Sequence, residues 1–236
     1  MHTRHPIGIF LAGLALLVAG NVFAGTTPHA FTARYQVLRN GNTIGTVSMT
    51  LRAQSDGTWR YISKMRGTSG LAGLLGASLD ENSLLRWRNG RPETVDYRYH
   101  MNVAFKDRKR HVHVDWSTGT VHVTQDGKMH QYPVHDGLVD QHAIPLALGL
   151  ALAGGAHDIT LPVAVKDRVE MQHYRVTGDR VLDVPVGRYR ADRVDRIDKD
   201  KAFSAWYVPG RYPIPVKLRK DGKDKLSLLL QRFTRN

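Results

Sequence analysis

Residues 95–124 read VDYRYHMNVAFKDRKRHVHVDWSTGTVHVT, and the spacing within this stretch decides the fold class. Apolar side chains recur at every second position of 95–105, with four polar residues between them: Asp96, Arg98, His100 and Asn102. A period of two residues indicates a β-strand with one buried and one exposed face. Histidines and valines alternate in the same way on both sides of the turn signal at 117–119. The stretch therefore predicts antiparallel strands.

The same alternation recurs along the chain. It covers 31–37, 47–53, 59–65, 159–165 and 226–230. Asn-Gly and Asp-Gly pairs, which favour tight hairpin turns, separate many of the runs and begin at Asn40, Asp56, Asn89, Asp126 and Asp221. We therefore expect an antiparallel meander of roughly 10–12 strands.

The strands leave an apolar face that the fold must cover. A single sheet hides such a face by curling, by pairing with a second sheet, or under helices. Two apolar, glycine-bearing segments, 69–77 and 140–154, could provide cover as lids or as plain core helices. In the second, Asp140 is placed to cap a short helix, Pro145 falls in its first turn, and Gly154 ends it. The predicted class is mainly β: a single curled antiparallel sheet (half-barrel or open barrel) with two short apolar helical lid segments.

The N-terminal segment predicts export. Residues 7–18 are apolar, follow Arg4, and precede small residues that end at Ala24. This pattern predicts a cleaved signal peptide over 1–24, followed by a single mainly-β domain over 25–236. The apolar run is shorter than the ~20 residues that a membrane-spanning helix needs. In a Gram-negative host, we expect the mature protein in the periplasm.

Composition narrows the chemistry and the partners. The chain has no cysteine, which excludes disulfides and thiolate metal sites. Its formal net charge is +13. For a periplasmic protein, that charge favours an anionic membrane surface or lipopolysaccharide over nucleic acid as a partner, although solubility alone would also explain it.

Three histidines form the one group of residues in the sequence that could bind a metal ion. If 116–119 is a hairpin loop, His113 faces His122 and Val112 faces Val123, and His111 shares the face of His113. Three imidazoles on one face can hold zinc with an open position for water. His111, His113 and His122 are therefore the candidate metal ligands, and zinc is the only cofactor indicated. Solvent-exposed histidines on an outer wall are the alternative.

A second polar group precedes the predicted helix and contains His135, Asp136, Asp140 and His142. These residues could form an acid–base site, but aspartates before helices commonly serve as turn and cap residues. The chain contains no G-x-S-x-G, H-E-x-x-H or P-loop motif. We therefore predict no catalytic residues.

Several segments together resemble bacterial domain-of-unknown-function family 3108, whose members are mostly exported. They are HDGLVDQHAIPLALGLAL (135–152), the run 174–189, and AWYVPGRYPIPVKLR (205–219), the most specific of the three. That family implies no activity. In architecture the chain is also similar to periplasmic lipoprotein carrier and receptor proteins, although it lacks the N-terminal cysteine of the lipidated receptor.

The second resemblance implies a non-catalytic protein that binds or carries an apolar or amphiphilic ligand, lipid or lipoprotein-like, in cell-envelope maintenance. The ligand-binding candidates are then aromatic residues of the apolar stripes and of the C-terminal segment: Trp59, Tyr61, Tyr97, Tyr99, Phe105 and Trp206. Two alternatives remain. A structural or assembly partner of the envelope would fill its core with its own side chains, and a zinc-dependent hydrolase would use the three histidines.

Overall fold

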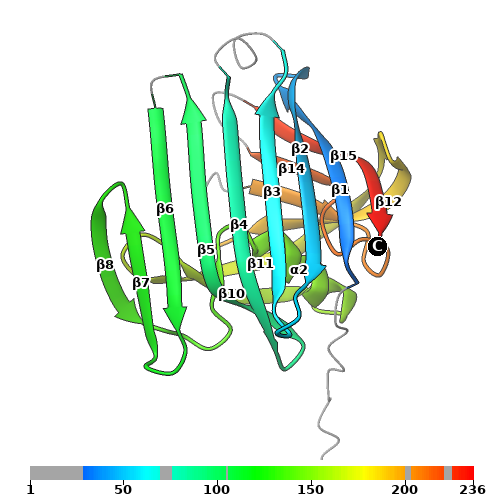
Figure 1. Cartoon of the computed structure of the whole chain (residues 1–236). Helices are drawn as coiled ribbons and strands as arrows, with labels where there is room; N and C mark the ends of the chain where they lie inside the picture. Colours follow the sequence, from blue (N-terminus) through cyan, green and yellow to red (C-terminus); the bar gives the residue numbers. More distant parts are fainter. Residues whose placement is uncertain (1–28, 70–75, 105, 200–202, 221–224) are drawn as a thin grey trace, which may run out of the picture.

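A computed structural model describes residues 29–69, 76–104, 106–199, 203–220 and 225–236. Within them, one fifteen-stranded sheet has the order β8-β7-β6-β5-β4-β3-β2-β1-β15-β14-β13-β12-β11-β10-β9. The order begins at β8 and ends at β9, so the sheet does not close into a barrel. In Figure 1, β1–β8 form the near layer and strands of the second half cross behind them. The predicted fold class, mainly β with one open curled sheet, is confirmed.

The first half of the chain is a run of consecutive antiparallel strands. They are β1 (Phe31–Arg39), β2 (Asn42–Ala53), β3 (Trp59–Gly67), β4 (Ser78–Arg88), β5 (Arg91–Val103), β6 (Lys106–Asp115), β7 (Thr120–Gln125) and β8 (Lys128–Pro133). The predicted two-residue turns after Arg39, Arg88 and Gln125 all have positive φ at both central residues. This conformation matches the right-handed twist of the flanking strands, and asparagine, aspartate and glycine tolerate it best.

The second half completes the sheet and contains the single described helix. Its elements are β9 (Val139–Asp140), α2 (Ile144–Ala153), β10 (Asp158–Ala164), β11 (Val169–Val184), β12 (Gly187–Arg196), β13 (Phe203–Tyr207), β14 (Lys217–Lys220) and β15 (Leu226–Arg235). β15 pairs with β1 and so joins the two halves. The short β9 pairs in parallel with β10. Next to it, the Thr94 N–H on β5 donates to the Leu138 carbonyl over 2.9 Å.

Helix α2 lies in the main core. Its sequence, IPLALGLALA, is apolar on every side, as expected for a helix that lies mostly in the core, and six of its ten residues are buried. Close packing of its backbone is possible because residue 149 is glycine: a Cβ there would lie 2.1 Å from the Pro213 carbonyl oxygen. The Tyr207 hydroxyl donates to the Pro145 carbonyl over 3.1 Å and ties β13 to the first turn.

The predicted limits of this helix need one correction. Pro145 does fall in the first turn and Gly154 is the C-terminal cap, but the N-cap is Ala143, which makes no side-chain cap hydrogen bond. Asp140 lies three residues earlier. Its carboxylate accepts the N–H groups of His142 and Ala143, so it stabilises the turn before the helix rather than the helix itself. The other proposed lid, 69–77, falls mostly outside the described residues, as does the predicted signal peptide.

Aromatic and aliphatic side chains fill the interior between the sheet and the helix. The largest fully buried ones include Phe31, Tyr35, Tyr61, Tyr174 and Tyr207. The Tyr35 hydroxyl donates to the Pro215 carbonyl over 2.7 Å, which satisfies a polar group that would otherwise be unpaired in the core. In the described part of the chain, no helix is long and apolar enough to span a bilayer.

A bulge in β5 corrects the predicted apolar stripe. Leu84 pairs with Asp96 and Leu85 pairs with Thr94, which leaves Val95 without a partner. Such an extra residue shifts the side-chain alternation on one side of the bulge. Thr94 is therefore fully buried, and Val95 does not continue the stripe of Tyr97 and Tyr99 as the strict period predicted.

Candidate functional site

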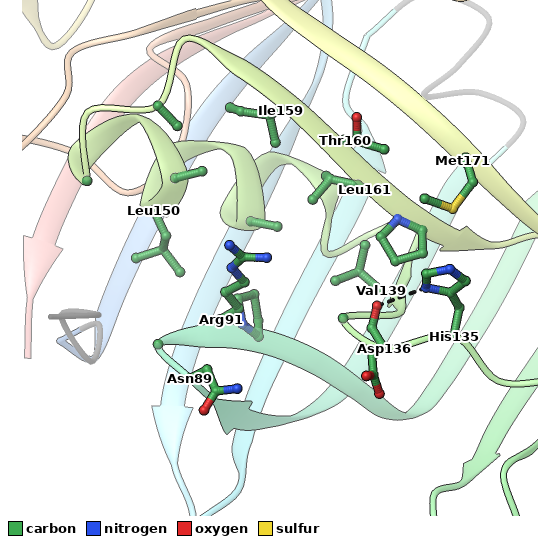
Figure 2. A pocket seen from close by; sticks show the side chains of 18 of the residues that line it. Asn89, Arg91, His135, Asp136, Val139, Leu150, Ile159, Thr160, Leu161 and Met171 are labelled. Carbon is green, nitrogen blue, oxygen red and sulfur yellow. Dashed lines mark hydrogen bonds between the residues drawn. The ribbon is translucent and has the colours of Figure 1, made fainter. Parts of the chain in front are cut away.

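A cavity of about 460 Å³ lies beside helix α2, between the β4–β5 turn, the loop before β9, and β10. Its volume falls in the range of roughly 300–1,000 Å³ that is typical of small-molecule sites. Much of its wall is apolar and is formed by Val139, Leu150, Ala151, Ile159, Leu161 and Met171. Figure 2 shows Val139, Leu150, Ile159, Leu161 and Met171 arranged around the hollow.

Small residues on one face of α2 make room for the cavity. Ala147, Leu150, Ala151 and Gly154 line it, and their spacing of three and four places them on one helical face. Ile159 and Leu161 approach from β10 two residues apart, so they share a face of that strand. Two alanines and a glycine in these helical positions leave space that larger side chains would fill.

The β4–β5 turn brings a positive charge to the cavity. Asn89 and Gly90 both have positive φ, 51° and 74°, so the turn is tight and Arg91 begins β5 directly at the cavity edge. Figure 2 shows the Arg91 side chain reaching from this turn toward α2. Within the described residues its guanidinium has no ion-pair partner.

The two acidic residues at the rim lie near arginines other than Arg91. Asp158 pairs with Arg175 over 2.8 Å, and Asp136 lies 3.9 Å from Arg88. His135 stands beside Asp136, with its Nδ1 3.1 Å from the Asp136 carbonyl oxygen (Figure 2). The cavity thus combines an apolar wall with the Arg91 guanidinium, which no described carboxylate pairs, at its edge.

A buried polar network anchors the loop that leads into α2. The Ser83 hydroxyl lies 3.0 Å from Asp140 Oδ1 and 2.9 Å from His142 Nδ1. The Thr94 hydroxyl donates to Asp140 Oδ2 over 2.8 Å and accepts the Asp140 backbone N–H over the same distance. Residues from β4 and β5 therefore fix Asp140, and through it the start of the helix that lines the cavity.

Burial sets the protonation of this network. Burial lowers the pKa of His142 to about 4, against the opposing attraction of Asp140, so the imidazole is neutral at pH 7. Burial also raises the pKa of Asp140, although His142 and the surrounding hydrogen-bond donors oppose that rise. Ser83 is 0% and His142 7% exposed. Serine, aspartate and histidine side chains can support acid–base chemistry. Because Ser83, Asp140 and His142 are buried here, we interpret them as part of the framework that holds α2.

The four residues considered as an acid–base group before the helix thus separate in the fold. Asp140 and His142 lie in the core, whereas His135 and Asp136 lie at the cavity rim. The local sequence indicated the role of Asp140 in a turn. Its contacts with Ser83 and Thr94 join residues 57 and 46 positions apart, which local spacing cannot reveal.

The aromatic residues proposed as ligand contacts do not meet at this cavity. Tyr61, Tyr97 and Trp206 are buried in the protein. Trp59 packs against Trp87 with ring centroids 5.7 Å apart, and Tyr99 packs against a smaller core cluster. Phe105 lies outside the described residues.

Arg91 and the small residues of α2 were not identified as cavity residues from the sequence. The available signals were the Asn89-Gly90 turn and the Ala147–Ala151 spacing.

The histidine hairpin has the expected register. His113 pairs with His122 and Val112 with Val123. The rings of His113 and His122 lie 6.4 Å apart between centroids, and His111 Nε2 is 2.5 Å from Asp96 Oδ2. Among the described residues, no group of three or more histidine, cysteine, aspartate or glutamate side chains is arranged to hold a metal ion. Zinc binding by His111, His113 and His122 stays a prediction.

Comparisons with known proteins identify a family but no activity. Residues 30–228 match the family described as "Protein of unknown function (DUF3108)". A solved β-barrel-like protein of domain family DUF1849 from Brucella abortus is similar in structure, with a TM-score of 0.49 and 11% sequence identity over 88% of this chain and 98% of that chain. No curated protein matches the chain.

Proposed function

The chain belongs to the DUF3108 family of proteins of unknown function, and from that premise we propose that it is a non-catalytic protein that binds an amphiphilic small molecule in the cavity beside α2. The observation that carries the proposal is the pairing of an apolar wall with the Arg91 guanidinium at the cavity edge, which has no ion-pair partner in the described part of the chain. An amphiphile has the complementary design, with an apolar chain and a polar head. We place this activity in the periplasm, where the predicted signal peptide would deliver the chain.

The energetics of an apolar cavity favour a chain-like ligand. Each methylene group moved from water into such a site contributes about 0.8 kcal/mol. Micromolar binding corresponds to about 8 kcal/mol, and immobilising the ligand costs at least about 4 kcal/mol more. A chain of roughly fifteen methylenes would therefore supply micromolar binding. Arg91 would select a ligand with an anionic head, since a guanidinium forms charge-assisted hydrogen bonds with carboxylates and phosphates.

Filling the cavity tests the proposal. Ala151→Phe would project a ring into the cavity from α2, while Ala53→Phe makes the same change at an exposed position at the end of β2. Each protein would be purified from a periplasmic fraction, examined by native mass spectrometry, and titrated with a fluorescent fatty acid. We expect the wild type and Ala53→Phe to bind the probe and Ala151→Phe to bind at least tenfold more weakly. Equal binding by Ala151→Phe and Ala53→Phe would overturn the proposal.

One observation favours a second candidate, a structural or assembly partner of the envelope. The core between the sheet and α2 is filled by the protein's own aromatic and aliphatic side chains. A wild-type protein that carries no amphiphile and does not bind the fluorescent fatty acid, yet crosslinks to an envelope protein in cells, would favour this candidate.

A further inference from the structure

Four basic side chains gather around one tryptophan, outside the lining of the cavity beside α2. The charged groups of Arg180, Lys217, Arg193 and Arg219 lie 4.9, 5.2, 5.7 and 5.7 Å from the ring centroid of Trp206. Trp206 is 1% exposed and belongs to the main hydrophobic core. They come from β11, β12 and β14, and none of the five residues lines the cavity beside α2.

The strand register creates this cluster. Trp206 on β13 is paired directly with Arg193 on β12 and with Lys217 on β14. Directly paired residues present their side chains on the same face of a sheet, so both cations flank the indole. The ring attracts cations through its negative face, which helps to hold the basic groups in a fixed place.

Arg180 and Lys217 give this cluster positive charge that no carboxylate among the described residues pairs. Arg193 is paired with Asp195 over 2.9 Å, and Asp195 also accepts hydrogen bonds from Ser204 and Thr177. In the described part of the chain, Arg180 and Lys217 have no carboxylate partner. The pKa of Lys217 is lowered by burial and then by the charges of Arg180 and Arg219, so the three cations repel one another.

We infer that Arg180 and Lys217, flanked by Arg219, form a binding site for a phosphate group, with Trp206 as the floor that holds them in place. A bound oxyanion would relieve their mutual repulsion. Arginine forks match tetrahedral oxyanions with two parallel hydrogen bonds, and the lysine adds a point charge. The phosphate can belong to a soluble phosphate compound or to an anionic lipid head group, since the chemistry of recognition is the same.

A matched pair of double variants tests this site. Arg180→Gln with Lys217→Gln removes two charges at the cluster. Arg175→Gln with Arg190→Gln removes two charges from β11 and β12 that are already paired, with Asp158 and Asp179 respectively. All four positions are at least partly exposed, and circular dichroism would check that each variant folds. The two double variants have equal net charge, so loss of general attraction affects both alike.

Calorimetric titration with inorganic pyrophosphate at low salt would measure binding of a soluble phosphate compound. Co-sedimentation with vesicles of phosphatidylcholine alone, or of phosphatidylcholine and phosphatidylglycerol at about 3:1, would measure binding to an anionic lipid head group. We expect one pyrophosphate per chain, or selective sedimentation with the anionic vesicles, and a loss of at least tenfold only in Arg180→Gln/Lys217→Gln. Pyrophosphate binding would indicate a soluble phosphate ligand, and sedimentation alone a lipid head group. No binding in either experiment, or equal loss in both double variants, would overturn the inference.

Discussion

The imidazole of His142 stacks on the phenol ring of Tyr61, with centroids 4.3 Å apart and the ring planes at 13°. Its Nδ1 contacts Ser83, while its Nε2 is buried and has no hydrogen-bond partner in the described structure. A protonated imidazole would place a charge and an unpaired donor in this enclosed position. The contact between β3 and the loop before α2 therefore requires neutral histidine.

This requirement predicts a pH dependence of stability. The pKa of His142 falls from 6.5 to about 4 on folding, so the unfolded chain takes up a proton in this window and the folded chain does not. Neutral His142 therefore contributes about 3 kcal/mol to the unfolding free energy above pH 6.5, and this contribution is lost as the pH falls toward 4. Urea unfolding between pH 7 and pH 4 would measure it.

The variant His142→Asn isolates this contribution, because asparagine can replace Nδ1 but does not titrate. The raised pKa values of Asp140 and Glu81 act in the opposite direction and remain in both proteins. We expect the difference in unfolding free energy between wild type and variant to shrink as the pH falls. Parallel pH profiles would show that His142 does not titrate in this way.

A second prediction concerns Asp140, whose carboxylate receives hydrogen bonds from Ser83, Thr94 and two backbone N–H groups. Asp140→Ala leaves those buried donors without an acceptor, and we expect a loss of about 3–4 kcal/mol in unfolding free energy. Asp136→Ala is the control, because the Asp136 side chain is 88% exposed, and it should change stability by less than about 0.5 kcal/mol. Similar melting temperatures for the two variants would contradict the anchoring role of Asp140.

Some of this site could be predicted from sequence and some could not. Alternation and Asn-Gly turns depend on neighbouring residues, so the strands, the hairpin register of His113 with His122 and the place of Pro145 in α2 were accessible. The bulge at Val95 breaks the period without any glycine or proline to mark it, and it is this bulge that turns Thr94 inward. The contacts of Ser83 and Thr94 with Asp140 depend on how β9 meets β5, which no local pattern encodes.

A third prediction follows from the close packing of α2 at Gly149. A methyl group there would lie 2.1 Å from the Pro213 carbonyl oxygen, which belongs to the backbone and cannot rotate away. We expect Gly149→Ala to destabilise the protein by about 3 kcal/mol, although alanine favours helices. Gly154→Ala, at the helix end with φ −82°, should be nearly neutral in the same chemical denaturation assay. If Gly149→Ala is equally neutral, α2 does not pack on residue 213 as described.

The last prediction tests whether Arg91 recognises the head of the proposed amphiphile. Arg91→Gln removes a guanidinium that has no ion-pair partner among residues with a described structure, whereas Arg88→Gln, on the other side of the same turn, removes one that lies near Asp136. A charge-assisted hydrogen bond is worth about 1.5–3 kcal/mol, so Arg91→Gln should weaken binding of a fluorescent fatty acid at least about tenfold. Binding of a neutral alcohol with the same chain should change little, because its contacts are with the apolar wall. Equal losses for acid and alcohol would mean that Arg91 shapes the cavity without selecting charge.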